Sequence, residues 1–292
     1  MAGSLKIWIL AARPKTLPAA AAPVIIGTAM AYEAGAFHLL SALAALFGAL
    51  LIQIGTNLAN DYFDFKKGID QSDRLGPLRV TQAGLVTPNQ TKIATIIIFA
   101  LAILIGVYLV YRGGWPIVII GLLSVLFGVL YTGGPAPIGY IGLGDIFVLI
   151  FFGPVAVGGT FYVQALSITP EVLIAGLAPG LFSTAILTVN NLRDADSDKL
   201  SGKKTLAIRF GKNFARWEYL LCVMLALFVP DIIYAINNNH PYILISTVVL
   251  LFSFPAIKKV FTHEGPILNE VLATTGKLLL LYSLIFSIGW LL

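Results

Sequence analysis

Long apolar stretches dominate the chain, and short polar or glycine- and proline-containing segments separate them. About 20 apolar residues in a helix cross the hydrocarbon core of a bilayer. The pattern predicts nine transmembrane helices, at roughly residues 16–34, 39–60, 92–111, 115–131, 142–163, 171–191, 217–236, 241–261 and 272–291. Turn signals such as Gly113-Gly114, Thr169-Pro170 and Gly265-Pro266 stand between them. We therefore expect an all-α polytopic membrane protein with nine transmembrane helices.

The composition agrees with this fold class. Of the 292 residues, 58% are hydrophobic and only 11% are charged, whereas a soluble domain averages about 25% charged residues. The single cysteine, Cys222, excludes an internal disulfide. Because Cys222 lies in an apolar run, we expect it to be a small buried side chain.

The distribution of positive charge predicts the orientation. With a cytoplasmic N-terminus, 17 of the 19 Lys and Arg residues fall on the cytoplasmic side. The N-terminal segment holds three, and the loops after the second, sixth and eighth helices hold five, seven and two. Cytoplasmic loops of membrane proteins carry such an excess. The net charge of +5 therefore reflects topology, and nucleic acid is not an expected partner.

Two acidic motifs end the second and sixth predicted helices. They are Asn57-x-x-x-Asp61-x-x-Asp64 and Asn190-x-x-x-Asp194-x-x-x-Asp198. An α-helix turns about 100° per residue, so each triad should form one acidic stripe. Carboxylates at the end of a membrane helix are costly, which favours a functional role. Both motifs are expected at the cytoplasmic face.

The two motifs also suggest an internal repeat within a single transmembrane domain of residues 1–292. The repeat units would be about 1–131 and 142–261, with a last helix at 272–291. Parallel repeats related by an axis along the membrane normal occur in other membrane folds. Such an axis would bring the motifs together across a central cavity, although chance similarity of two membrane-edge segments is the alternative.

The residue types of the motifs favour magnesium and a diphosphate. Mg²⁺ takes carboxylate oxygens together with substrate phosphate oxygens. A side-chain amide supplies a further oxygen ligand or orients a carboxylate. The predicted metal ligands are therefore Asn57, Asp61, Asp64, Asn190, Asp194 and Asp198. Basic residues interleave with them, and the candidates for diphosphate contact are Lys67, Arg79, Lys203, Lys204 and Arg209. The positive-inside rule alone would also explain these bases.

A glycine- and proline-rich loop, YTGGPAPIGYIGLGD, follows the fourth predicted helix. Tyr131 and Tyr140 bracket it, and an aromatic face there would stabilise an allylic cation by about 0.5–2 kcal/mol. Aromatic residues also gather at membrane interfaces for other reasons. Asp145 follows the loop, and either binds a substrate hydroxyl or caps the next helix.

These residues resemble those of the UbiA-type intramembrane prenyltransferases, over essentially the full length. The resemblance implies nine transmembrane helices and two Asp-rich motifs, on helices two and six, that bind Mg²⁺ and a prenyl diphosphate. The first motif departs from the family's usual spacing of aspartates four apart, because positions 65 and 68 are Phe65 and Gly68. The roles of Asp64 and Asp70 are therefore less defined than that of Asp61.

Within the family, the chain is most similar to members that act in menaquinone synthesis. The stretches that carry this likeness are NLANDYFDFKKGID, GPLRVTQAGLV, YTGGPAPIGYIGLGD and NNLRDADSDKLSGKKTLAIRFG. The resemblance implies transfer of a polyprenyl chain to 1,4-dihydroxy-2-naphthoate with loss of carbon dioxide, giving demethylmenaquinone. It also implies a bacterial cell membrane and an active site that opens to the cytoplasm.

Two other functions remain open. One is prenyl transfer to another aromatic acceptor, such as 4-hydroxybenzoate or homogentisate. The other, of a different class, is an ion-coupled transporter. Transport sites usually lie near the membrane midplane, whereas both acidic motifs here are expected at one membrane face.

Overall fold

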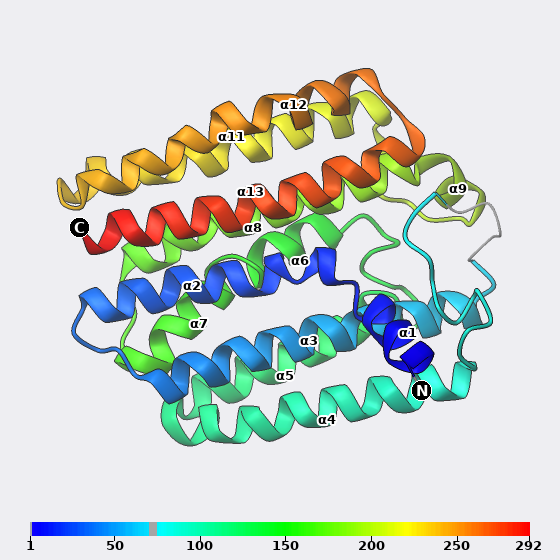
Figure 1. Ribbon diagram of the computed structural model, residues 1–292, viewed down its shortest axis with the longest axis horizontal. Helices are drawn as coiled ribbons and strands as arrows, with labels where there is room; N and C mark the ends of the chain where they lie inside the picture. The colour runs from blue at the N-terminus through cyan, green and yellow to red at the C-terminus, as the bar shows by residue number, and fades with distance from the viewer. Residues whose placement is uncertain (1, 70–74) are drawn as a thin grey trace.

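The computed structural model describes residues 2–69 and 75–292, and these residues form helices and connecting loops without any strand. The helices run side by side in one bundle (Figure 1). This arrangement confirms the predicted all-α class. It satisfies the backbone of each segment internally, as a lipid environment requires.

Five α-helices lie in the described residues of the first half of the chain. They are α1 (Ala2–Ala12), α2 (Pro18–Glu33), α3 (Leu39–Lys66), α4 (Pro88–Gly113) and α5 (Trp115–Leu130), and the short helix η1 (Pro14–Thr16) joins the first two. Leu5–Thr16 meets Pro18–Glu33 at 56°. Proline at the start of α2 explains part of this break, because its ring cannot continue the preceding turn.

The second half begins with α6 (Gly144–Phe151) and α7 (Pro154–Ala165), which share one apolar segment. The break between them is at Gly153, which packs closely on α8 (Pro170–Arg193). A Cβ at Gly153 would lie 2.7 Å from the carbonyl oxygen of Gly176, and one at Gly180 would lie 2.4 Å from that of Leu149. Glycine therefore allows close contact between the α6–α7 segment and α8.

The remaining elements complete the bundle. They are α9 (Ala195–Leu200), α10 (Leu206–Arg209), α11 (Lys212–Asn237), η2 (Pro241–Val248), α12 (Val249–Thr262), η3 (Gly265–Ile267) and α13 (Leu268–Leu291). In the described residues, seven helical segments are long and apolar enough to cross a membrane, or eight when the bent α1–α2 pair counts as one. The helix α5, of 16 residues, is apolar but shorter. Each of the nine predicted segments overlaps a helix.

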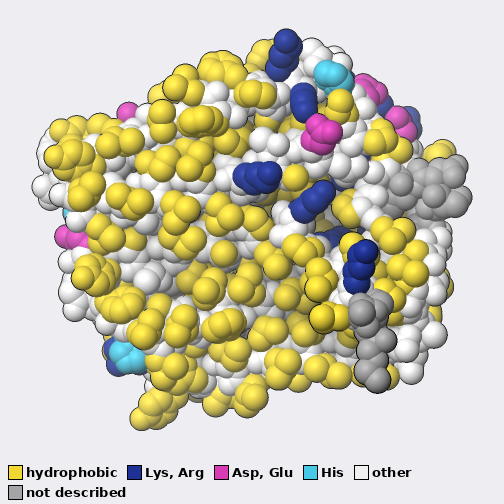
Figure 2. All heavy atoms as spheres, in the orientation of Figure 1, with side chains coloured by type: hydrophobic (Ala, Val, Ile, Leu, Met, Phe, Trp, Pro, Cys, Tyr) yellow, Lys and Arg dark blue, Asp and Glu magenta, His cyan; other side chains and the backbone are white. Residues whose placement is uncertain are grey.

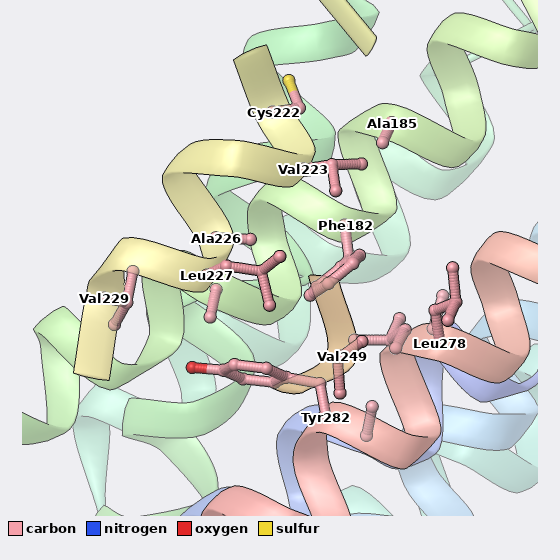
Figure 3. Packing of buried hydrophobic residues seen from close by; sticks show 14 of the residues in the cluster. Phe182, Ala185, Cys222, Val223, Ala226, Leu227, Val229, Val249, Leu278 and Tyr282 are labelled. Atoms are coloured by element: carbon pink, nitrogen blue, oxygen red, sulfur yellow. The ribbon is translucent and has the colours of Figure 1, made fainter. Parts of the chain in front are cut away.

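The packed core lies around α8. Its apolar window is 67% buried, whereas that of α4 is 11% buried, which makes α8 the central helix and α4 peripheral. Phe182 of α8 packs with Val223 and Leu227 of α11 and with Tyr282 of α13 (Figure 3). Cys222 is buried beside them, as its apolar surroundings predict.

The surface divides into an apolar wall and a charged end. On the face in Figure 2, hydrophobic side chains cover most of the wall, and Lys and Arg gather toward the end that carries α1 and α9 in Figure 1. The carboxyl ends of α3 and α8 lie at this same end. Both acidic motifs are therefore at one end of the bundle.

Candidate active site

The first motif lies on one continuous helix, as predicted. Asn57, Asp61 and Asp64 are all buried on α3. The amide nitrogen of Asn57 donates to the carbonyl of Ala12 and to Thr16 Oγ1, each at 3.1 Å. These two bonds attach the N-terminal segment to the motif and direct the amide oxygen of Asn57 away from that segment.

In the described part of the chain, Asp61 has one carboxylate oxygen with a partner and one without. Its Oδ2 accepts a hydrogen bond of 3.3 Å from the backbone nitrogen of Thr81. Its Oδ1 is buried and has no hydrogen-bond partner among the described residues. An orphaned buried carboxylate oxygen costs free energy unless it gains a donor or a cation. This atom therefore fits a metal ligand.

Asp64 is paired with two groups from other segments. Its carboxylate accepts a hydrogen bond from the hydroxyl of Tyr140 and forms a buried ion pair with Arg79. Arg79 also donates to the carbonyl of Asn60, at 3.3 Å. Asp70 and Asp73, which follow this motif, lie outside the described residues.

The second motif differs from the predicted continuous stripe. The helix α8 ends at Arg193, Asp194 lies in the break, and α9 begins at Ala195. The backbone nitrogen of Asp198 donates to the carbonyl of Asp194 at 2.8 Å, which keeps one helical turn across the break. The prediction of one unbroken helical stripe was wrong, because the chain bends at Asp194 toward the loop that follows.

Arg193 is a site residue that the sequence reading missed. It is buried and donates to both carboxylate oxygens of Asp194, at 2.8 and 2.6 Å. It also donates to the side-chain oxygens of Asn190 and Asn269, each at 2.7 Å. The charge pattern of the sequence places Arg193 only among the seven cations of the loop after the sixth predicted helix. The position of Arg193 between Asn190 and Asp194 is the feature of the sequence that indicates a role in the site.

Tyr140 joins the two motifs. Lys67 Nζ, beyond the first motif, and Lys203 Nζ, beyond the second, lie 4.8 and 4.9 Å from the centre of its ring. Lys203 also pairs with Asp198 at 2.7 Å. The same ring thus lies against a cation from each half of the chain while its hydroxyl reaches Asp64.

Burial sets the electrostatics of this cluster. It raises the pKa of the Asp198 carboxyl, against the attraction of Lys203. Burial also lowers the pKa of Lys67, against the attraction of Asp64. Lys67 donates to the carbonyls of Thr132 and Gly134, at 2.7 and 3.3 Å. The cluster is partly removed from water, so charges on a bound ligand would act strongly on it.

The other predicted site residues differ in how exposed their side chains are. The side chain of Lys204 is exposed, and its backbone nitrogen donates to the Tyr140 carbonyl at 2.7 Å. Asp145 is buried in the first turn of α6, but Leu143 occupies the N-cap. Asp196 is exposed and pairs with Lys212.

The oxygen-rich donor set fits a hard cation such as Mg²⁺. Within residues 2–69 and 75–292, no group of three His, Cys, Asp or Glu side chains is assembled to hold a metal by itself. Three motif carboxylates instead pair with a cation, namely Asp64, Asp194 and Asp198. A metal here would therefore need ligand oxygens from a substrate as well.

Sequence comparison decides the family. Residues 20–267 match the UbiA prenyltransferase family. The chain belongs to this family. The 1,4-dihydroxy-2-naphthoate octaprenyltransferase of Escherichia coli (strain K12) is 41% identical to it, over 97% of this chain and 94% of the relative. The Haemophilus influenzae enzyme of the same name is 35% identical, over 98% and 96%.

Solved structures share the UbiA fold. A UbiA homolog from Archaeoglobus fulgidus, bound to GPP and Mg²⁺, superposes with a TM-score of 0.68 at 15% identity, covering 98% of this chain and 99% of that one. The apo structure of a UbiA homolog from Aeropyrum pernix K1 gives 0.69 at 15% identity, covering 94% and 96%. At these identities the likeness concerns the fold.

Proposed function

We propose that this UbiA-family protein transfers a polyprenyl chain from an allylic prenyl diphosphate to 1,4-dihydroxy-2-naphthoate, with loss of carbon dioxide, to give demethylmenaquinol, the reduced form of demethylmenaquinone. One observation carries the proposal. Asp64 and Lys67 from the first motif meet Lys203 from the second, which pairs with Asp198, around Tyr140 at one end of an apolar bundle. A lipid diphosphate has the matching form, a charged head on an apolar tail. The names of the full-length relatives support the choice of acceptor.

The donor would bind with its diphosphate between the motifs. Bound Mg²⁺ would supply positive charge that stabilises the departing diphosphate. Its protein ligands would come from Asn57, Asp61, Asp64, Asn190, Asp194 and Asp198. Asp61 leads this set because its Oδ1 has no other partner in the described chain. The Archaeoglobus homolog, with GPP and Mg²⁺, supports a divalent cofactor.

The chain's own cations would complete the charge balance. Lys67, Lys203 and Lys204 would contact the diphosphate or the acceptor carboxylate, and Arg79 would hold Asp64 in place. The π-faces of Tyr131 and Tyr140 would stabilise the allylic cation as the carbon–oxygen bond breaks. A ring carbon of the acceptor then forms the new bond, and the ring becomes aromatic again as carbon dioxide leaves.

The proposed topology places this chemistry at the cytoplasmic face of a bacterial cell membrane. The N-terminus would be cytoplasmic and nine helices would cross the bilayer, including α5 and the bent α1–α2 pair. The distribution of Lys and Arg in the sequence supports this orientation. We also propose a single domain over residues 1–292, with repeat units 1–131 and 142–261 followed by the helix 272–291.

An assay with purified protein in lipid tests the function. Protein, Mg²⁺ and a polyprenyl diphosphate would be mixed with 1,4-dihydroxy-2-naphthoate, 4-hydroxybenzoate or homogentisate. We expect release of diphosphate and carbon dioxide with the naphthoate only. Faster turnover of another acceptor would identify that acceptor, and not the naphthoate, as the substrate. Absence of transfer to all three would overturn the enzyme class.

A further inference from the structure

Two carboxylates outside both aspartate motifs are removed from solvent, one fully and one partly. Asp145 is in the first turn of α6, and Glu218 is in the second turn of α11. The two side chains lie within electrostatic range of each other. Glu218 is partly buried.

Asp145 carries an unmet hydrogen-bonding requirement. Its side chain is buried, at 5% exposure, and its Oδ1 has no hydrogen-bond partner among the described residues. Such buried polar atoms are rare in folded proteins and each needs an explanation. A ligand that donates a hydrogen bond would provide one.

Tyr131 connects this carboxylate pair to the aspartate motifs. A Cβ built on Gly144 would lie 3.0 Å from the Tyr131 hydroxyl, so the tyrosine reaches the start of α6. The same side chain is within electrostatic range of Asp145, Asp198 and Asp64. A molecule bound at Asp145 would therefore be separated from the motif carboxylates by the Tyr131 side chain.

The charges around the pair select the kind of ligand. Asp145, Glu218 and Cys222 lie within electrostatic range of one another, and the Arg209 guanidinium donates to the Ile141 carbonyl in the loop before Asp145. An anionic ligand group would be repelled here, whereas a neutral O–H donor would form a charge-assisted hydrogen bond. The lysines that follow the two motifs lie around Tyr140 instead.

These observations orient an aromatic acceptor. In 1,4-dihydroxy-2-naphthoate the carboxylate is next to the 1-hydroxyl, and the 4-hydroxyl is on the opposite edge of the ring. We propose that the 4-hydroxyl donates a hydrogen bond to Asp145, beside Glu218, while the carboxylate faces Lys67 and Lys203. This inference rests on the proposed function, which it deepens by naming the residues that select the acceptor.

Binding of two acceptors under anaerobic conditions tests the orientation. The dissociation constants of 1,4-dihydroxy-2-naphthoate and of 1-hydroxy-2-naphthoate, which lacks the 4-hydroxyl, would be measured on each variant. We expect the wild-type protein to prefer the dihydroxy compound about tenfold, as for a hydrogen bond to a charged group. Asp145→Ala should remove this preference. Asp145→Asn, which keeps the side-chain shape, should reduce it, and so should Glu218→Gln.

The controls separate the possible failures. Asp196→Asn, at an exposed acid, should keep the wild-type preference. Unchanged affinity for the prenyl diphosphate would show that a variant is folded. If Asp145→Ala does not fold, the binding preference of Asp145→Asn decides the test. An unchanged preference in the folded Asp145 variants, or no preference in the wild type, overturns the inference. A wild type that neither binds nor prenylates any naphthoate overturns the proposed function instead.

Discussion

The hydroxyl of Tyr140 donates a hydrogen bond to the carboxylate of Asp64, although 76 positions separate the two residues in the chain. This bond connects the loop before α6 to the first motif. Lys203 contacts the same ring from the second motif. The two acidic segments therefore belong to one polar cluster.

Replacing Tyr140 should separate its two roles. Tyr140→Phe removes the bond to Asp64 but keeps the ring beside both lysines, so we expect about tenfold weaker binding of the prenyl diphosphate. Tyr140→Ala also removes the cation–π contacts and should weaken binding further. Donor titration by calorimetry checks this order. Tyr111→Phe, at a side chain 89% exposed, serves as the control. Equal affinities for all variants would contradict a role of Tyr140 in the donor site.

Asp61→Asn should lower turnover by about two to three orders of magnitude without loss of stability. The unpaired Oδ1 contributes nothing to the fold that the substitution would remove. Thermal unfolding and steady-state rates measure the two effects separately. Near-normal turnover would exclude Asp61 as a metal ligand.

Asp194→Ala should behave differently, since it leaves Arg193 as a buried charge without its carboxylate partner. We expect a loss of about 3–5 kcal/mol in the free energy of unfolding. The double variant Arg193→Met/Asp194→Leu, which removes both charges, should recover stability but remain inactive. Denaturant unfolding in detergent compares them. If Asp194→Ala is as stable as wild type, the pair does not stabilise the fold.

Removal of magnesium should abolish the stabilisation that a prenyl diphosphate gives. At about 100 times its dissociation constant, a ligand that binds only the folded state adds about 2.7 kcal/mol. We expect this gain with Mg²⁺ present and little of it after addition of a chelator, because the motif carboxylates would then repel the diphosphate. Thermal melting with donor, with and without EDTA, measures the difference. Equal stabilisation in both conditions would argue against a metal.

Gly180→Ala should destabilise the protein by about 1–3 kcal/mol through overpacking. The added methyl would collide with the carbonyl of Leu149, which cannot move without shifting α6. Since α6 carries Asp145, acceptor binding should weaken too. Gly121→Ala, where no atom lies within 4 Å of the added Cβ, is the matched control. Equal stability of the two variants would contradict the close packing of α6 on α8.

The sequence by itself determined the fold class, the helical segments and the first motif. Apolar runs of membrane length leave the backbone few alternatives to helices, and a three- and four-residue spacing fixes a shared face wherever the helix is continuous, as it is from Asn57 to Asp64. It also singled out Tyr131, Tyr140 and Asp145 as candidates, because they stand near a turn-rich loop.

Only the tertiary structure decided which of these side chains meet. Tyr140 reaches Asp64 from a loop 76 positions away, Arg193 of α8 contacts Asn269 of α13, and Glu218 of α11 lies within electrostatic range of Asp145 of α6. Helical periodicity specifies a face of one helix, but not which neighbouring helix covers that face. The break at Asp194 was hidden for a related reason, since the contacts that Arg193 makes with Asn190, Asp194 and Asn269 form only after the helices have packed.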